Sequence, residues 1–251
     1  MVRPLVSWWV ARIIIKRDHR IGGRGVHAPD WEKLLQTQRL IQAHFPNAVL
    51  VGGTASAMYA EHRLSLDVNS VLADLRSQFP AVLGELENLA GLKPRRTRPP
   101  VLILGHFEGV DVGIRQLIRQ APLETTTVDG IVIPTLAEML RIKGWLIVTR
   151  NAVRDYIDFA ALAEAAGDAF EDGMRPMDIY YPQPDDADTT SQQLAKMLAE
   201  PRPHDFHPDE DSLTVWRALK RPWTDWTFVS RRCRELSARL FTVFVEGGSW
   251  S

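Results

Sequence analysis

Two adjacent glycines, Gly52 and Gly53, constrain this chain more than any other feature, because of what lies on either side of them. Residues 48–51 form an apolar run that is short enough for a buried strand. Thr54 and a run of small residues follow, and this composition suits a tightly packed helix. Adjacent glycines between a strand and a helix allow a sharp turn and a close approach to a ligand. The free N–H groups at the start of such a helix are a natural phosphate site.

A polar pair follows the predicted helix, in the segment Ser65-Leu66-Asp67-Val68-Asn69. In a strand, Asp67 and Asn69 would point to the same face, because they lie two residues apart. The pair would then lie close to the glycine turn. Hard oxygen donors beside a phosphate cradle are what a Mg²⁺-dependent phosphoryl or nucleotidyl transfer needs.

The order of these parts resembles the nucleotidyltransferases of the DNA polymerase β superfamily and, more closely, the AbiEii-type toxin family. The matching residues are Gly52-Gly53-Thr54, His62-Arg63, Ser65 and Asp67. The resemblance implies an α+β fold with a polymerase-β-like nucleotidyltransferase core, in which helices flank a mixed sheet, and a mainly helical C-terminal portion. It covers roughly residues 30–165.

The resemblance also implies roles for individual residues. Gly52, Gly53 and Thr54 would cradle the triphosphate of an NTP, and Ser65 belongs to the same nucleotide-binding set. Asp67 would bind Mg²⁺, the implied cofactor. Arg63 follows the turn and is assigned a supporting role.

The sequence departs from the family pattern at Asn69, where the family has a second aspartate. Asn is neutral and is a poorer ligand than Asp for a divalent cation. Asn69 therefore weakens the predicted activity while leaving the predicted fold unchanged. It is compatible with a natural variant that binds metal weakly and with a substitution that silences a toxic enzyme.

A third carboxylate is predicted on a later strand. Residues 101–104 form an apolar strand, and a turn at Glu108 and Gly109 leads to a second strand that contains Asp111. An acid within an apolar strand is costly unless it is paired or binds metal. By the resemblance, Asp111 would bind Mg²⁺ and help to activate the attacking hydroxyl. Gly113 lies on the same face and is the alternative equivalent position.

The helix predicted to begin near Thr135 carries a lysine, Lys143, on an otherwise apolar surface. Such a lysine commonly extends to solvent, but the family has a lysine here, followed by an R-D-x-x-D-like segment. The corresponding residues are Arg154, Asp155 and Asp158, which implies that Lys143 contacts the triphosphate. Asp155 and Asp158 share one helix face, where they either buttress the lysine helix through ion pairs with Arg150 and Arg154 or face the nucleotide.

Four basic residues and three prolines predict a compact basic turn at residues 93–100. The basic residues are Lys93, Arg95, Arg96 and Arg98. The turn is interpreted as a solvated loop or as a contact to RNA phosphates or a nucleotide tail.

Other local patterns predict the remaining elements. Residues 71–90 favour a helix that Pro80 would kink or divide. Asp129-Gly130 is typical of a hairpin, and Thr135 with Glu138 predicts a capping box. Residues 168–211 predict a loop-rich connector with one helix near 191–199, and residues 223–245 a long amphipathic helix.

These patterns divide the chain into an N-terminal extension (1–29), a nucleotidyltransferase-like core (30–133) and a helical C-terminal portion (134–251). The formal net charge of −1 gives no overall attraction to nucleic acid or membrane. A single cysteine excludes an internal disulfide framework, and no apolar run approaches the roughly 20 residues that span a bilayer. We therefore expect a cytoplasmic protein that has no membrane partner.

The sequence thus predicts a Mg²⁺-dependent nucleotidyltransferase that transfers NMP from an NTP to an acceptor and is weakened by Asn69. The resemblance implies an RNA acceptor, such as a tRNA 3′ end, or in other branches a protein. It also implies a toxin role with a cognate antitoxin protein as a partner. The alternatives are a catalytically impaired nucleotide- or RNA-binding pseudoenzyme and an interaction partner within a toxin–antitoxin pair.

Overall fold

A five-stranded mixed sheet dominates one half of the computed structural model, which describes residues 31–208, 211–215 and 219–246. The strand order is β1-β2-β5-β4-β3, with β2 and β5 parallel and the other neighbours antiparallel. The strands are β1 (Val49–Val51), β2 (Asp67–Leu72), β3 (Leu92–Arg98), β4 (Leu102–Phe107) and β5 (Val110–Gln116). The predicted N-terminal extension, 1–29, lies outside the described residues.

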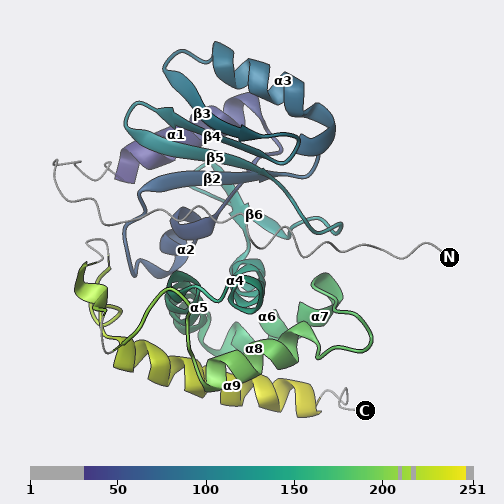
Figure 1. Ribbon diagram of the computed structural model, residues 1–251, viewed down its shortest axis with the longest axis vertical. Helices are drawn as coiled ribbons and strands as arrows, with labels where there is room; N and C mark the ends of the chain where they lie inside the picture. The colour runs from purple at the N-terminus through teal and green to yellow at the C-terminus, as the bar shows by residue number, and fades with distance from the viewer. Residues whose placement is uncertain (1–30, 209–210, 216–218, 247–251) are drawn as a thin grey trace.

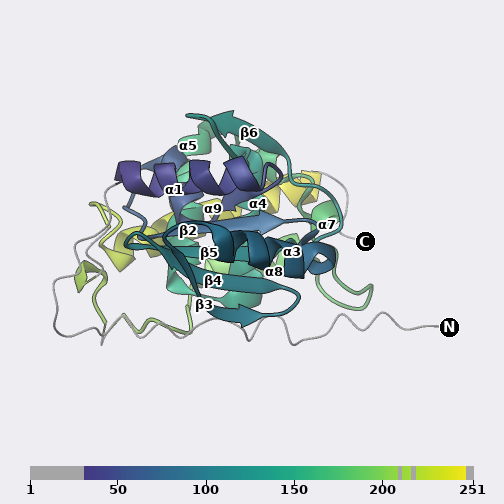
Figure 2. The same ribbon diagram turned by 90° about the horizontal axis from the view of Figure 1, so that it is seen from above.

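The two faces of the sheet have different neighbours. Helices α1 (Trp31–His44) and α3 (Leu75–Asn88) cover one face, as Figures 1 and 2 show. Ser70 of β2 points to that face, because its hydroxyl donates to Gln38 of α1 over 2.8 Å. Strand side chains alternate between faces, so Asp67 and Asn69 lie on the opposite face, toward α2 (Gly52–Ala60).

The chain after the sheet is mostly helical. A hairpin of β6 and β7 connects the sheet to the helices, which form the lower part of Figure 1. The elements that follow the sheet are β6 (Thr125–Val128), β7 (Ile131–Pro134), α4 (Leu136–Arg150), α5 (Val153–Ala166), η1 (Gly167–Ala169), α6 (Phe170–Met174), α7 (Met177–Tyr180), α8 (Thr190–Ala199), η2 (Leu213–Val215) and α9 (Trp226–Glu246). No helix within the described ranges is long and apolar enough to cross a membrane.

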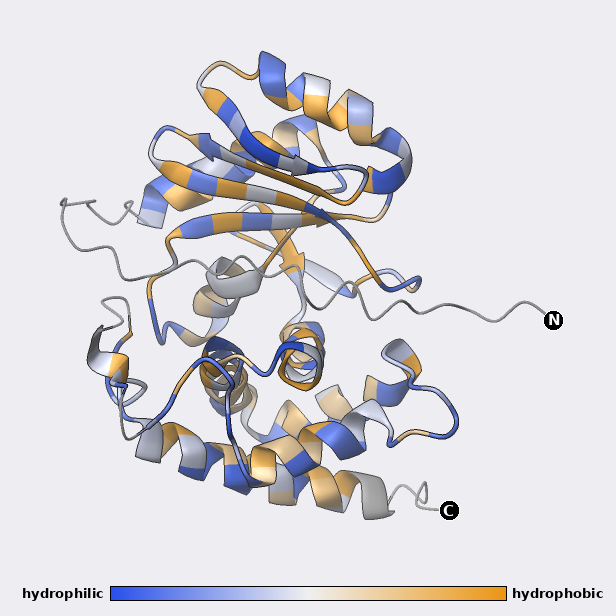
Figure 3. Ribbon diagram, in the orientation of Figure 1, coloured by the Kyte–Doolittle hydropathy of each residue, from blue (hydrophilic) through white to orange (hydrophobic). Residues whose placement is uncertain are grey.

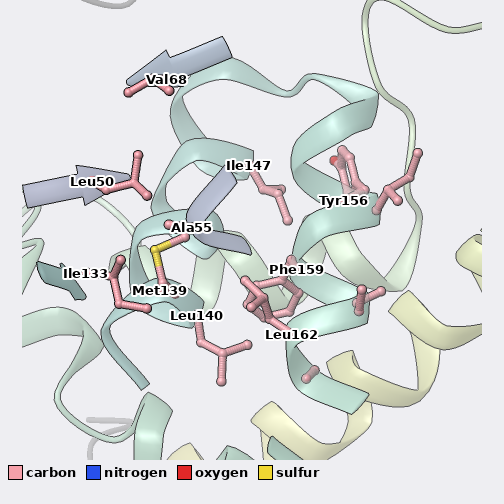
Figure 4. Close-up of a cluster of buried hydrophobic side chains, with 14 of the residues drawn as sticks. Leu50, Ala55, Val68, Ile133, Met139, Leu140, Ile147, Tyr156, Phe159 and Leu162 are labelled. Carbon is pink, nitrogen blue, oxygen red and sulfur yellow. The ribbon is translucent and has the colours of Figure 1, made fainter. Parts of the chain in front are cut away.

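One apolar core joins the sheet to the helices. Polar and apolar residues alternate along the strands (Figure 3), so a strand such as β2 places its buried side chains on one face of the sheet. Figure 4 shows Leu50 of β1, Ala55 of α2, Met139 of α4 and Phe159 of α5 as members of one hydrophobic cluster, and all four are fully buried. The strands and the helices that carry the site are therefore held together by shared packing.

The predicted fold class is confirmed: the protein is α+β, helices flank a mixed sheet, and the C-terminal part is mainly helical. The Asp129-Gly130 hairpin is also confirmed, with both residues at positive φ, 51° and 76°. Thr135 caps α4 through the amide of Glu138. The carboxylate of Glu138, however, contacts Arg119 and Arg141 rather than completing a capping box.

Three local predictions are wrong. The connector predicted over residues 168–211 contains α6 and α7 in addition to the one helix expected there, α8, because Phe170, Met174 and Met177 pack into the core. The basic segment is not a turn but strand β3, which pairs with β4 along the sheet edge and has an irregularity between Pro94 and Arg96. The helix predicted over residues 71–90 begins only at Leu75, because Leu72 still pairs with β5. That helix runs to Asn88 and contains Pro80 without dividing there.

Candidate active site

The glycine turn brings the start of α2 close to β2. Gly52 has a φ of +76°, a conformation that residues with a Cβ rarely adopt. Gly53 leaves room for the guanidinium of Arg63, since a Cβ at this position would lie 2.1 Å from Nη2 of Arg63. The hydroxyl of Thr54 donates to the carbonyl of Asp67 over 2.5 Å. These contacts fix the turn, Arg63 and the start of β2 as one unit.

The parallel pairing of β2 and β5 brings the two predicted aspartates together. Asp67 is in register with Asp111, and Asn69 is in register with Gly113. Register partners on adjacent strands have side chains on the same face, so both aspartates lie on the face that carries Asn69. Gly113, the alternative position for the third acid, leaves the space into which Asn69 fits. A Cβ on Gly113 would lie 2.5 Å from Oδ1 of Asn69.

Each oxygen of the Asp67 carboxylate accepts a hydrogen bond. Ser65 Oγ donates to Oδ1 over 3.2 Å, and Asn69 Nδ2 donates to Oδ2 over 2.9 Å. Asn69 thus stabilises the Asp67 carboxylate, whereas an aspartate at this position would repel it.

Asp111 is held by two basic side chains that sequence reasoning did not place there. Nδ1 of His106 lies 3.1 Å from Oδ1 of Asp111, and Arg95 lies 3.5 Å from the same oxygen. The amide of Gly109 donates to Nε2 of His106 over 3.1 Å, so Nδ1 carries the proton and donates to Asp111. Antiparallel pairing of His106 with Asp111 across the β4–β5 hairpin could have indicated this contact.

Lys143 lies within a buried ion network between α4 and α5. Its Nζ is 2.7 Å from Oδ2 of Asp158 and 3.2 Å from Oδ1 of Asp155, and the residue is 3% exposed. Asp158 also accepts from Arg63 Nε over 2.7 Å, and Asp155 accepts from Arg150 Nε over 2.8 Å. Each aspartate therefore links Lys143 to an arginine.

This arrangement supports the buttressing interpretation of Asp155 and Asp158, both of which are fully buried. The ammonium of Lys143 is engaged by their two carboxylates, so a direct contact of Lys143 with a triphosphate stays a prediction. The side chains of Arg63 and Arg150 lie at the edge of the network and are 12% and 25% exposed. Sequence reasoning gave Arg63 only a supporting role, and it named Arg150 as an ion-pair partner of the aspartates, a contact that Arg150 makes with Asp155.

The charges in the network are strongly coupled. Burial alone would raise the pKa of Asp158, but Arg63 and Lys143 outweigh it and hold that pKa well below its usual range. Burial and the nearby Arg150 lower the pKa of Arg115, which Asp67 partly opposes. Arg115 of β5 is therefore close enough to interact electrostatically with both Arg150 of α4 and Asp67 of β2.

Two carboxylates in register on neighbouring strands fit a single Mg²⁺ ion, which proteins commonly bind through one or two carboxylates together with substrate phosphates. Asp67 and Asp111 would hold the ion. Among the residues that the structure describes, no group of three or more His, Cys, Asp or Glu side chains could hold a metal. The donor set is therefore sparse, and Asn69 offers only an amide at the position of a further ligand.

The fold and site together define an α+β protein with two aspartates beside a glycine turn and a basic cluster. Solved structures of similar arrangement include JHP933 from Helicobacter pylori, with a TM-score of 0.49, 16% identity and coverage of 86% of this chain and 90% of that chain. A nucleotidyltransferase candidate from H. pylori (TM-score 0.48, 16% identity) covers 89% and 97% of the two chains. Both TM-scores fall below 0.5, so function has to be argued from the site itself.

Part of the chain is similar in sequence to much longer transport proteins. No protein-family model matches the chain. The heme uptake protein MmpL11 of Mycobacterium tuberculosis is 38% identical over 113 residues, which is 41% of this chain and 12% of that protein. The mycolic acid-containing lipids exporter MmpL11 of Mycolicibacterium smegmatis is 34% identical over 130 residues, or 49% of this chain and 13% of that protein. The chain thus spans about an eighth of the length of these relatives.

Proposed function

We propose that this protein is a nucleotidyltransferase that uses an NTP and Mg²⁺ and transfers NMP to a hydroxyl group of an RNA acceptor. The observation that carries the proposal is the register of Asp67 with Asp111 on adjacent parallel strands, directly beside the glycine turn. A helix start that can bind phosphate, two carboxylates and a basic cluster are the parts that transfer of a phosphoryl group requires.

The chain's own residues would position the reactants and balance their charges. The amides of the glycine turn and the guanidinium of Arg63 would hold the triphosphate, while Asp67 and Asp111 would hold the metal. Mg²⁺, when bound, neutralises phosphate charge and orients the phosphates. The acceptor oxygen forms a bond to the α-phosphorus, the bond from that phosphorus to the bridging oxygen breaks, and pyrophosphate leaves. Asp111 accepts the proton of the acceptor hydroxyl.

Lys143 acts indirectly in this scheme. Through Asp158 it holds Arg63, and through Asp155 it holds Arg150. The buried lysine and aspartates thereby set the position of two arginines that can meet phosphate. The resemblance to AbiEii-type toxins further suggests a tRNA 3′ end as acceptor and a cognate antitoxin protein as partner.

Label transfer tests the proposal. The natural chain, Asn69→Asp and Asp67→Asn are each incubated with every α-labelled NTP, Mg²⁺ and total cellular RNA. We expect transfer to be strongest with Asn69→Asp and absent with Asp67→Asn, because the first variant adds a carboxylate and the second removes one. If neither the unsubstituted protein nor Asn69→Asp transfers label to RNA from any of the NTPs, the proposal is wrong.

A second candidate, a nucleotide-binding pseudoenzyme, is favoured by one observation: the amide of Asn69 donates to Asp67 and so occupies a carboxylate oxygen. This candidate predicts that the natural chain and Asn69→Asp both bind NTP and that neither transfers it. Equilibrium binding of a fluorescent NTP analogue, measured alongside the transfer assay, separates the two candidates.

A further inference from the structure

The face of the sheet that bears the aspartates continues across β4 to the edge strand β3. Pairing places His106 of β4 opposite both Asp111 and Lys93. The next row on this face joins Gly113 and Leu104 to Arg96. A third row joins Arg115 and Leu102 to Arg98. Since register partners share a face, three basic residues of β3 lie on the same face as the candidate active site.

The irregularity in β3 adds a fourth basic residue to this face. Arg95 is the extra residue between Pro94 and Arg96, and such bulges re-aim side chains. Its guanidinium lies 3.5 Å from Oδ1 of Asp111, which shows that it points along the sheet toward the site. Neighbouring strands lie about 4.8 Å apart, so β3 lies roughly 10 Å from the strand of Asp111. The basic residues are thus continuous with the site.

The basic residues of β3 are also available to a partner. Lys93, Arg95, Arg96 and Arg98 are all exposed. Within the described part of the chain, no side-chain hydrogen bond or ion pair engages Lys93, Arg96 or Arg98, whereas other arginines such as Arg119 and Arg239 bind carboxylates. This local excess of positive charge stands out in a chain whose formal net charge is −1.

We propose that the β3 basic strand, defined as Lys93, Arg95, Arg96 and Arg98, binds the phosphates of a single-stranded RNA whose 3′ end reaches Asp111. This inference rests on the proposed function and identifies where its acceptor lies. An extended row of cations that leads from the sheet edge into the site matches a linear polyanion. Basic residues that only protect a sheet edge from pairing would not need to lie on one face and reach a catalytic carboxylate.

RNA binding tests this inference separately from nucleotide transfer. One variant combines Lys93→Gln, Arg96→Gln and Arg98→Gln. The control combines Arg175→Gln, Lys196→Gln and Arg202→Gln, three exposed basic residues of the helical part, and lowers the formal charge by the same amount. Fluorescence anisotropy measures the affinity of each protein for a short, labelled, single-stranded RNA across a range of salt concentrations, and a fluorescent NTP analogue reports on nucleotide binding.

We expect the β3 variant to bind RNA about 10- to 100-fold more weakly near 0.1 M salt, with the slope of log K against log salt reduced by about two, while the control and nucleotide binding stay unchanged. Equal losses in both variants, or none in either, would overturn the inference. Binding that depends on β3 but is directed to phosphatidylserine vesicles instead of RNA would also overturn it. A third outcome separates the two proposals: the β3 variant loses RNA binding, but the unsubstituted protein shows no nucleotide transfer. That outcome would support the RNA-binding surface and reject the proposed nucleotidyltransferase activity.

Discussion

Asn69 has nearly the shape of an aspartate, but it attracts the carboxylate of Asp67, whereas an aspartate at this position would repel it. Its Nδ2 donates to Oδ2 of Asp67, and its Oδ1 fits against the backbone of Gly113. A carboxylate at position 69 would lie against the carboxylate of Asp67, since Nδ2 of Asn69 is 2.9 Å from Oδ2 of Asp67. The two groups would repel each other and would need a cation between them. The site with Asn69 therefore holds no like-charge pair between these two residues, and we expect its dependence on Mg²⁺ to increase when residue 69 carries a negative charge.

The first prediction concerns the stability of Asn69→Asp. We expect its melting temperature to fall in EDTA, because like charges meet, and to recover in Mg²⁺, whereas the natural chain changes little. Asn47→Asp, which adds the same charge at an exposed turn, serves as the control. Thermal unfolding with and without Mg²⁺ provides the measurement. An Asn69→Asp variant that is as stable in EDTA as in Mg²⁺ would show that no ion binds between these residues.

Gly53 provides the second prediction. A methyl group here would collide with the guanidinium of Arg63, which cannot withdraw freely because Asp158 holds it through two hydrogen bonds. We expect Gly53→Ala to destabilise the protein by about 1–3 kcal/mol, the range for overpacking, and to weaken NTP binding. Gly84→Ala, at a helical position with no neighbour within 4 Å, should instead stabilise by about 1 kcal/mol. Urea unfolding and nucleotide titration check both variants, and unchanged NTP affinity in Gly53→Ala would remove Arg63 from the phosphate site.

At the scale of elements, the ion network ties α4 and α5 to the loop between α2 and β2, which carries Arg63. Asp158 has a folded pKa well below that of the unfolded chain, because Arg63 and Lys143 outweigh its burial. As the pH falls below the unfolded value of about 3.9, the unfolded chain binds a proton that the folded protein does not. The stabilisation from Asp158 is therefore fully present above that pH and is lost as the pH falls through the folded pKa.

The third prediction follows from this shift. We expect the Asp158 contribution to the free energy of unfolding to decrease by up to about 1.4 kcal/mol per pH unit below roughly pH 4. Asp158→Asn should lose about 3–5 kcal/mol near neutral pH, because Lys143 and Arg63 lose a buried partner, and should show a shallower acid dependence. Urea unfolding from neutral to acidic pH measures both. Parallel acid profiles for the two proteins would mean that Asp158 does not carry the dependence.

The elements show which features the sequence could specify. Local signals were sufficient for the glycine turn, the Asp129-Gly130 hairpin and the long α9, since each depends on residues close in the chain. β3 escaped prediction because Pro94 within it and Pro99-Pro100 directly after it are typical of a turn, and only pairing with β4 makes the segment a strand. The partners of Lys143 were in the predicted motif, but its burial depends on the packing of α4 against α5, which no spacing reveals.

At the scale of the whole molecule, the C-terminal part of the chain holds the loop that carries Arg63. The amide of Lys220 donates to the carbonyl of His62 over 2.9 Å, and Leu219 forms a bridge with Arg63. The ring of Trp223 meets His62 edge-on, with centroids 6.2 Å apart. Segments far apart in the sequence thus meet at the candidate site. The sheet supplies the carboxylates of Asp67 and Asp111, and the helical part positions the arginine side chains.

The last prediction tests this coupling through Trp223, which is 7% exposed. Trp223→Leu should lower the free energy of unfolding by about 1–3 kcal/mol, because a large side chain is lost from a packed position. It should also weaken NTP binding, because His62 and Arg63 lose their support. Trp145→Leu, which removes a ring that stacks on Tyr181, should lower stability without changing NTP affinity. Urea unfolding and titration with a fluorescent NTP analogue measure both effects. If the two variants bind NTP equally well, the C-terminal segment contributes to the core alone and the site is built by residues 52–158 without it.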